Sequence, residues 1–550
     1  MSLRNRLVLP IIVSALAVLA GCGGSGTSNP TPPPSGAFSN TNFNGAYTFS
    51  VLGANASGTF AMAGTLTACG CIAGTISGGS VDLVDSVPTV YAAAAIGSNS
   101  TYSISKDGRG FAKLSITPTG GTAFEVDVDF VLTSSNHGLI TRYDPNGTGS
   151  GTIDSQNLVA QAGLANLPFA YGLSGSDLAG DPLSQVGAFT LDASGNIIAT
   201  GASAGVADTT LYSFSTFTAT PFPDSALTGS VVVGSATAPG PVTLSTASFG
   251  TLKFDVYVID SAHLKLIETD GLEVLVGDVF TQPSATIPAG NLIFSMAGPD
   301  PGGNPFAAAG VMVSDGTSKF TSGSSEDLND NGQVDFGSTT PQAFTGTFVN
   351  SPAGSGRFEV TLSGFAPSGT LFAAYPSSAG LLLQEIDAGV GSGITGGVAL
   401  AQTNGASIAA SQGYGLNFTG ADISGLSPLE LDEIAEFKTT SGSKLTGILD
   451  ANDGGGLNTS NLSGNYSLGS GGLGSATLNA GFQSMFFYAA DNSTVLFLST
   501  DPVVVGLGAF EVQTTPAQSA LESPRTVPMF RPILRPHSAS RPGKAAFVRR

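Results

Sequence analysis

One short segment has the residue types and spacing of a calcium-binding loop. Oxygen-bearing side chains stand at alternate positions of EDLNDNGQVD: Asp327, Asn329, Asn331 and Asp335. Calcium prefers oxygen ligands, and Gly332 stands where such a loop turns sharply. Ser338 occupies the position of the usual bidentate glutamate, however, and the flanking pattern is strand. The segment predicts an ordinary Asp-Asn-Gly turn, with a calcium-stapled hairpin as the alternative hypothesis.

Two cysteines stand one residue apart, at Cys69 and Cys71, in a chain with three cysteines. In an oxidising compartment this pair predicts a small local disulfide. A bridge across so short a spacing requires a kinked strand, because a disulfide restricts the distance between its two Cα atoms. Two buried thiols are the alternative, and a metal site would require ligands that the nearby sequence lacks.

Two histidines occupy the same place in two related turns, His137 in SSNH and His263 in DSAH. Matched histidines are compatible with a catalytic or ligand-binding site. Two further turns of this kind carry Gly380 and Thr494 instead, and turns favour small polar groups. The pattern therefore predicts solvated turn residues.

Charge and missing motifs narrow the function. Ten basic and 38 acidic residues lie between 23 and 515, so this part carries a net charge of −28. Nucleic acid is not expected as a partner, because binding requires a basic surface. The chain has no H-E-x-x-H motif and no Walker loop. The sequence therefore predicts a protein that is not an enzyme, although a glycosidase pair among the 39 acidic residues stays open.

These turns belong to a sequence that repeats four times with a period of about 120 residues. Each copy opens on an aromatic strand, at 47–50, 171–174, 294–297 and 414–417, and closes on a glutamine, at Gln156, Gln282, Gln402 and Gln513. Units of this length indicate duplicated domains, because solenoid and propeller units run about 20–50 residues. The acidic turn recurs at 450–454 in the fourth copy, and the cysteine pair occurs once.

Within a copy, the sequence alternates as a strand does. Residues 124–130 read FEVDVDF, which places Phe and Val on one face and the acids on the other. The first copy predicts about eight strands, near 45–53, 58–67, 71–84, 100–106, 110–117, 122–133, 138–144 and 149–155. The fold class is therefore all-β, with four tandem antiparallel up-and-down barrels and a β-sandwich as the alternative. Ser427 and Pro428 are typical of a helix start, although the repeat places a strand there.

The N-terminus has the features of a secretory signal. Arg4 and Arg6 precede an apolar run that is too short to span a bilayer. The run ends at Leu19-Ala20-Gly21-Cys22, which resembles the lipobox of bacterial lipoproteins. That resemblance implies that Cys22 becomes the lipidated, palmitate-bearing first residue of the mature protein. Gly23, in place of Asp, implies the outer membrane.

The repeats also resemble uncharacterised tandem repeats of exported bacterial lipoproteins, especially acidobacterial ones. The likeness rests on the aromatic opening strand, the turn at 326–335, the glycine hairpins at 108–110 and 354–356, and the closing strand GTGSGTIDSQ. It covers residues 41–515. Because these motifs are turns, the resemblance implies a cell-envelope location and an architecture, without an activity.

The chain is thus predicted to consist of seven segments. They are a signal peptide (1–22), a flexible tether (23–40), four β-domains (41–158, 165–285, 288–402 and 408–515) and a disordered basic tail (516–550). Seven basic residues lie between 525 and 550. The tail could fold back on the acidic body or contact lipid phosphates, and an end without a partner is the simplest interpretation.

The favoured hypothesis is a non-enzymatic lipoprotein, anchored to the outer membrane through Cys22. Its β-domains would serve as a stalk, an adhesion module or an interaction module for a surface glycan or protein. A binding protein for a small apolar or glycan ligand is the alternative, and a hydrolase with a carboxylate site is the third hypothesis. The chain has 33 Phe and no Trp, which favours filled barrels. No cofactor is expected apart from the hypothetical calcium.

Overall fold

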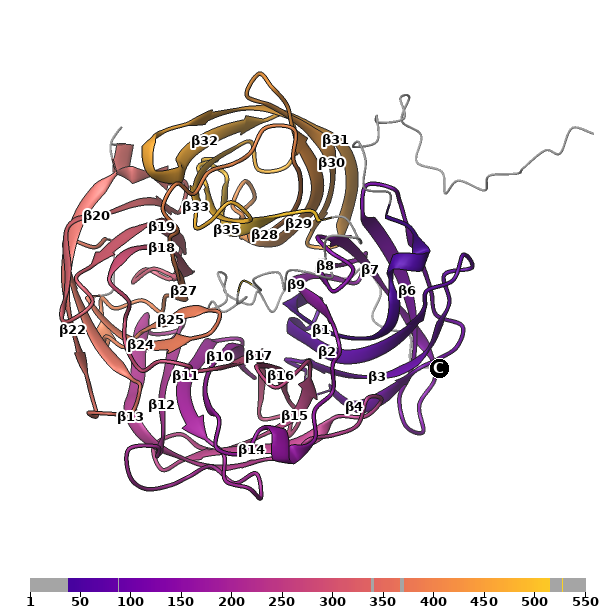
Figure 1. Cartoon of the computed structure of the whole chain (residues 1–550), viewed down its shortest axis with the longest axis horizontal. Helices are drawn as coiled ribbons and strands as arrows, with labels where there is room; N and C mark the ends of the chain where they lie inside the picture. The colour runs from indigo at the N-terminus through magenta and orange to yellow at the C-terminus, as the bar shows by residue number, and fades with distance from the viewer. Residues whose placement is uncertain (1–37, 88, 338–340, 367–369, 515–526, 528–550) are drawn as a thin grey trace, which may run out of the picture. The chain divides into compact units, whose positions relative to one another are not determined.

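The computed structural model describes residues 38–87, 89–337, 341–366, 370–514 and 527. These residues form antiparallel strands, β1 to β35, in four successive sheets (Figure 1). Each sheet closes on itself, so the predicted all-β architecture of four tandem barrels is confirmed and the sandwich alternative is wrong. The described short helices are 3-10 turns, at Asn40–Asn42, Gln161–Gly163, Asp335–Gly337 and Ser470–Gly472.

Barrel 1 has one strand more than the sequence predicts. Its strands are β1 (Asn44–Asn55), β2 (Gly58–Cys69), β3 (Ile76–Asp85), β4 (Thr89–Ile96), β5 (Thr101–Ile104), β6 (Arg109–Thr117), β7 (Phe124–Leu132), β8 (His137–Asp144) and β9 (Gly147–Ser155). Pairing of β4 with β6 closes the barrel, and β5 pairs with the earlier part of the same strand β6. The sequence analysis missed β4 because its four consecutive alanines have low strand propensity.

Barrels 2 and 3 close in the same way. Barrel 2 contains β10 (Pro168–Asp177), β11 (Pro182–Thr190), β12 (Gly205–Ser213), β13 (Thr218–Val231), β14 (Gly240–Thr246), β15 (Gly250–Val258), β16 (His263–Glu268) and β17 (Glu273–Thr281). Barrel 3 contains β18 (Gly290–Pro299), β19 (Pro305–Ser314), β20 (Lys319–Asp330), β21 (Gln333–Val334), β22 (Gln342–Asn350), β23 (Phe358–Ser363), β24 (Leu371–Ser377), β25 (Gly380–Glu385) and β27 (Gly396–Ala401). The short β26 (Gly389–Val390) leaves barrel 3 and pairs with β13 of barrel 2.

Barrel 4 consists of eight strands in chain order. They are β28 (Gly413–Asp422), β29 (Leu429–Thr439), β30 (Lys444–Asp453), β31 (Gly456–Leu468), β32 (Leu473–Leu478), β33 (Ser484–Ala489), β34 (Thr494–Ser499) and β35 (Val504–Val512). The segment after Pro428 is strand β29, as the repeat predicts, and not a helix.

A cluster of buried apolar side chains occupies each barrel. In barrel 4 this cluster includes Phe418, Phe482, Phe497 and Phe510, whose rings pack against one another. The other three barrels hold equivalent clusters of Phe, Tyr, Leu, Val and Ile. The inward-facing positions of the strands therefore supply the cores.

The strand pairing shows how the four copies correspond. In each barrel, the residue four positions before the closing glutamine pairs with one residue of the opening strand. These opening-strand residues are Ser50, Gly172, Ser295 and Asn417, which are therefore equivalent. By this register Tyr47 corresponds to Phe169, so its sequence alignment with Tyr171 is wrong by two residues. A slip of two leaves every side chain on the same face of the strand, so the apolar pattern does not reveal it.

The closing glutamine of each barrel reaches the next barrel. The side-chain amides donate hydrogen bonds to main-chain carbonyls: Gln156 to Val258 (2.8 Å), Gln282 to Gly356 (3.2 Å) and Pro376 (3.0 Å), Gln402 to Gly471 and Ala489 (both 2.8 Å), and Gln513 to Asp107 (2.7 Å) and Leu132 (3.1 Å). Gln513 belongs to the fourth copy and its two partners to barrel 1. The barrel contacts therefore follow the cycle 1, 2, 3, 4 and back to 1.

Candidate functional site

Polar side chains that point outward from the barrels meet at four contacts, which we call junctions 1/2, 2/3, 3/4 and 4/1. Three junctions contain the same pair, a tyrosine hydroxyl that donates to a buried aspartate of the preceding barrel. The pairs are Tyr257 with Asp82 (2.7 Å), Tyr375 with Asp208, and Tyr488 with Asp327. The aspartates lie on the third strand of their barrels, and the strand registers place them at equivalent positions.

The carboxylates of two of these pairs have a second acidic neighbour. Burial, with the nearby Asp255, raises the pKa of Asp82 to about 7. Burial and Asp335 likewise raise the pKa of Asp327 to about 7. At junction 2/3 the environment differs, because Arg357 binds both oxygens of Asp208 at 2.7 Å. Arg357 and Asp208 are both fully buried, and such bidentate pairing offsets the cost of desolvating two charges.

Junction 4/1 departs from this scheme. Val131 stands where the other barrels carry tyrosine, and its apolar contacts are Leu139 and Ile434. Hydrogen bonds dominate instead. Asp432 accepts from Thr148 at 2.7 Å and from Ser150 at 2.8 Å.

Asn452 adds a further polar contact at junction 4/1. Its side-chain amide faces three main-chain carbonyls of a barrel 1 hairpin, those of Arg142, Asp144 and Gly147, at 2.8–3.3 Å. This junction is therefore the most polar of the four.

The densest group of charges, which we call the central network, joins barrels 1, 2 and 4. Carboxylates alternate with basic groups along it, in the order Glu511, His137, Asp154, Lys265, Asp278 and His263. All six side chains are buried. The successive distances are 3.0, 2.6, 3.8, 2.9 and 2.8 Å. The hydroxyl of Thr152 accepts from Lys265 at 2.8 Å and donates to Asp154 at 3.2 Å.

Electrostatic interactions within the network shift the pKa values of His137, Asp154 and Asp278. Burial alone would lower the pKa of His137, but Glu511 and Asp154 outweigh burial and raise it to about 10. Burial alone would raise the pKa of Asp278, whereas Lys265 and His263 lower it below its ordinary value. His137 is therefore an imidazolium with a carboxylate at each ring nitrogen, and it has no free nitrogen to act as a general base.

The expectation that both histidines are solvated turn residues is wrong. His137 is 1% exposed and His263 is 7% exposed, because each begins a strand that faces a neighbouring barrel. Sequence reasoning also missed Lys265. Its position corresponds to Leu139, Leu382 and Leu496 in the other copies. A single lysine in an otherwise apolar row is the signal that could have identified a buried ion pair.

The residues of the calcium hypothesis contact protein groups. The amide of Asn329 faces the carbonyls of Ser499, Asp501 and Val504 in barrel 4, at 3.0–3.3 Å. Asp327 accepts from Tyr488, and Asp335 accepts from the amide of Leu328 at 2.8 Å. Asn331 lies in the turn, with φ at 50°. Among the described residues, no three His, Cys, Asp or Glu side chains gather as a metal site. Asn329 and Asn452 thus occupy equivalent positions, and each binds a hairpin of the next barrel.

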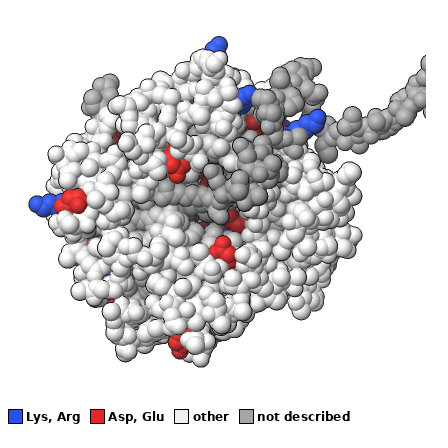
Figure 2. Space-filling view, viewed as in Figure 1, with Lys and Arg blue, Asp and Glu red and all other residues white. Residues whose placement is uncertain are grey.

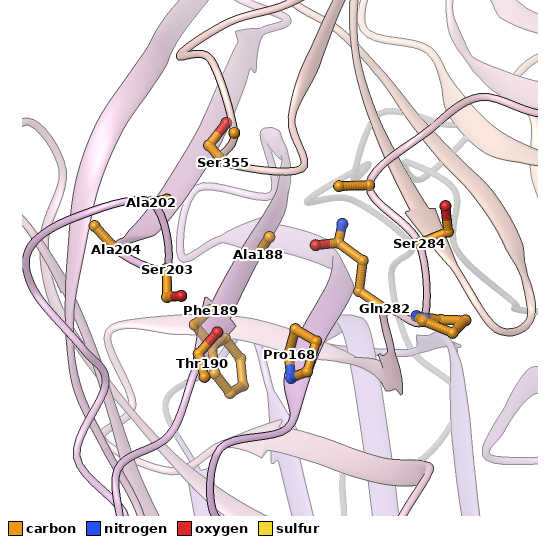
Figure 3. A pocket seen from close by; sticks show the side chains of 13 residues that line it. Pro168, Ala188, Phe189, Thr190, Ala202, Ser203, Ala204, Gln282, Ser284 and Ser355 are labelled. Atoms are coloured by element: carbon orange, nitrogen blue, oxygen red, sulfur yellow. The ribbon is translucent and has the colours of Figure 1, made fainter. Parts of the chain in front are cut away.

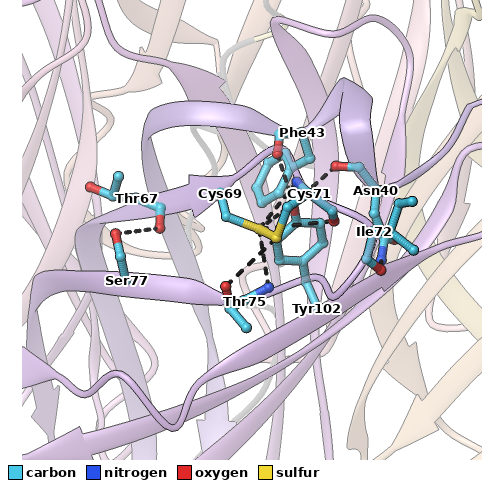
Figure 4. Close-up of a disulfide and its surroundings, with 9 residues drawn as sticks. All are labelled: Asn40, Phe43, Thr67, Cys69, Cys71, Ile72, Thr75, Ser77 and Tyr102. Carbon is cyan, nitrogen blue, oxygen red and sulfur yellow. Dashed lines mark hydrogen bonds between the residues drawn. A yellow bond between two sulfur atoms is a disulfide. The ribbon is translucent and has the colours of Figure 1, made fainter.

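Cys69 and Cys71 form a disulfide with sulfurs 2.12 Å apart (Figure 4). Strand β2 ends at Cys69, and Gly70 adopts a φ of 59°, which supplies the change of direction that this short spacing requires. The Cys69 sulfur accepts hydrogen bonds from the amides of Cys71 and Thr75. The bridge therefore lies in the turn between β2 and β3.

A cleft of about 150 Å³ lies at junction 2/3, beside the closing Gln282 (Figure 3). Its polar lining includes Thr190, Ser203, Ser284 and Ser355, and none of its lining residues is charged. Ser203 is the centre of a GASAG stretch, 201–205, with the spacing of a hydrolase nucleophile elbow that sequence reasoning missed. This stretch lies in the loop between β11 and β12 and ends at the first residue of β12, without the strand-to-helix turn of that motif, and no histidine lines the cleft.

The signal peptide with the lipidation residue Cys22, the tether up to residue 37 and the tail apart from Val527 lie outside the described residues. No helix within the described ranges is long and apolar enough to cross a membrane.

Comparison with known proteins identifies no family for this chain. No family model matches it, and no curated protein matches it. Among solved structures, it is similar to a Trp-176-Ala mutant of the vaccine antigen transferrin-binding protein B from Haemophilus parasuis, at 9% identity. That match covers 69% of this chain and 83% of the other, with a TM-score of 0.17, which is too low to support an argument about fold or function.

Replacing His137 with Leu would leave Asp154 and Glu511 buried without their shared cation. We expect a loss of about 3–5 kcal/mol in the free energy of unfolding near pH 6, because an unpaired buried charge is costly. The raised pKa of His137 means that its contribution is complete below about 6.5 and disappears as the pH rises through about 10. Urea unfolding at pH 6 and pH 10 measures both effects.

The matched control is Asn136→Ala in the same turn, where the side chain is exposed. It should change the unfolding free energy by less than about 0.5 kcal/mol. A His137→Leu variant as stable as this control would contradict an ionic role for the network.

Replacing Asp82 with Asn tests the acidic pair at junction 1/2. The pKa of Asp82 is raised to about 7, so the protonated form is favoured in the folded state and stability should fall as the pH rises from about 4 to 7. One such group contributes a slope of up to about 1.4 kcal/mol per pH unit. The Asp82→Asn variant should show a correspondingly flatter profile in urea unfolding between about pH 4 and 7. Glu359→Gln, at a half-exposed carboxylate, should retain the wild-type slope, and an unchanged slope for Asp82→Asn would refute the assignment.

Proposed function

We propose that the protein is a non-enzymatic lipoprotein of the outer membrane, whose four barrels act together as an adhesion or interaction module. The proposal rests on where the matched polar residues lie. The closing glutamines, the tyrosine–aspartate pairs and the central network all contact a neighbouring barrel. Polar groups that could have formed repeated active sites are therefore engaged in holding the barrels together.

The contacts of junction 4/1 favour a module over a stalk. A stalk gains length by joining domains end to end, so its first and last domains stay apart. Here Asp432 and Asn452 of barrel 4 contact barrel 1 directly. The four barrels would then present one combined surface to a partner.

The character of the exposed side chains supports contact with neutral partners. Strand β31 pairs with β30 and β32, so its backbone is occupied while its side chains are exposed. These side chains include Asn458, Asn461, Ser463, Asn465 and Ser467. Charged groups are few and scattered on the face shown in Figure 2. Amide and hydroxyl groups can bind neutral glycans and peptides through hydrogen bonds. An acidic surface would repel anionic partners, so neutral ones are favoured.

A second function, binding of a small neutral ligand, is supported by the cleft at junction 2/3. Its hydroxyl groups and the side chain of Gln282 match a polyhydroxylated molecule better than an ion, because no charged residue lines it. A saturable mass shift with a monosaccharide library, lost in a Gln282→Leu variant, would favour this function.

The anchor is tested at Cys22. In a diderm host that processes lipoproteins, the Cys22→Ala variant should incorporate no labelled palmitate and should remain as the longer precursor. Globomycin should likewise preserve the precursor of the wild-type chain. A Cys69→Ala, Cys71→Ala double variant, which keeps Cys22, is the control and should be labelled normally. Processing that is unaffected by globomycin would refute the anchor.

The module is tested with the purified chain from residue 23 onward. It should bind saturably to intact cells or to isolated neutral surface glycans, and it should show no turnover of glycoside, ester or peptide substrates. Binding is measured by co-sedimentation with fluorescently labelled protein. Turnover that is lost after a single carboxylate substitution would instead establish the hydrolase hypothesis.

A further inference from the structure

Val527 is the one residue between 515 and 550 that the structure describes, and it is buried. Its side chain is 6% exposed and belongs to the apolar cluster at junction 3/4. The other members come from barrel 3, including Val398 and Leu400, and from barrel 4, including Leu498 and Leu507. Val527 therefore packs where two barrels meet, 15 residues after the last strand ends at Val512.

In the part of the chain that the structure describes, the apolar clusters at the other junctions are formed by residues of the barrels. Junction 1/2 is formed by residues such as Ala61, Tyr257 and Ile267, and junction 2/3 by residues such as Val186 and Tyr375. At junction 3/4 the outward faces of β18, β27, β34 and β35 form a larger cluster, and Val527 is part of it. We call this surface the 3/4 patch.

The length of the connecting chain allows this contact. Thr514 donates its amide to the carbonyl of Thr133 in barrel 1 at 2.7 Å, so the chain leaves β35 at junction 4/1. Twelve residues lie between Thr514 and Val527, and the thirteen steps from one to the other can span up to about 45 Å when extended. The segment can therefore pass from one side of barrel 4 to the other.

Charge favours the same arrangement. Arg525 precedes Val527 by two residues and Arg531 follows it by four, within a tail of seven basic residues. The body from 23 to 515 has a net charge of −28, so a basic segment is attracted to it and loses that attraction in high salt. Val527, with a basic residue on either side, therefore matches the 3/4 patch, which is apolar and belongs to an acidic body.

We propose that the C-terminal segment 516–550 docks on the 3/4 patch through Val527 and acts as an intramolecular strap across barrels 3 and 4. The strap covers apolar surface at the junction and brings basic residues to the acidic body. This role is independent of the lipid anchor and of any partner of the module.

Trypsin cleavage of the full chain tests the strap. The bond after Arg525 lies beside Val527, whereas the bond after Lys544 lies further along the same tail, and Arg531, Arg535 and Arg541 each precede a proline that blocks trypsin. We expect cleavage after Arg525 to be at least about tenfold slower than after Lys544, because proteolysis follows the population of the undocked segment. Mass spectrometry of timed samples measures both rates in one molecule.

Val527→Ser should raise the rate after Arg525 to that after Lys544, and 1 M NaCl should raise it in the wild-type chain. The matched control is Val548→Ser, the same change elsewhere in the tail, which should leave the slow rate unaltered. Equal rates at both bonds of the wild-type chain would overturn the proposal. Protection of Arg525 that appears solely when phosphatidylglycerol vesicles are added would also overturn it, because the tail's partner would then be a membrane.

Discussion

Polar side chains can be buried between the barrels because each meets a partner on the neighbouring barrel. An isolated charge in such a place would cost several kcal/mol, whereas the acidic and basic side chains of the central network lie 2.6–3.8 Å from one another. His137 lies at the start of β8, yet its partners come from β9 and from β35 of barrel 4. The placement of barrel 4 against barrel 1 therefore depends on this pairing.

The same constraint produces a division between the two faces of the strands. Period-two alternation sends Phe, Leu and Val into each barrel, where they form separate cores. Outward positions of strands at the junctions must satisfy a neighbour, so they carry Asp82, Asp208 and Asp327 opposite tyrosines. Exposed positions of β31, such as Asn461, Ser463 and Asn465, carry neutral polar groups. One fold thus supplies a core face, a junction face and a surface face from copies of a single sequence.

Junction 4/1 has a different physical basis from the other three. The other junctions join barrels that are consecutive in the chain, whereas Thr148 and Asp432 are separated by 284 residues. Its apolar cluster consists of Val131, Leu139 and Ile434, and most of its contacts are hydrogen bonds and ion pairs. Hydrogen bonds with buried acceptors require a specific geometry but contribute modestly to net stability. Junction 4/1 therefore fixes the alignment of barrel 4 on barrel 1 more than it adds hydrophobic stabilisation.

The sequence by itself determined the repeat, the strand class and the barrels, because alternation and turn chemistry are local properties that survive in every copy. It also identified Gln156, Gln282, Gln402 and Gln513 as matched positions. Only the tertiary structure decided what these residues do, since each glutamine contacts a barrel that the next copy forms. The matched histidines were misjudged for the same reason, and the contacts of the calcium-like turn could not be foreseen. Asn329 and His137 bind groups of barrel 4 that lie more than 160 residues away in the chain, and no spacing within a single copy contains that information.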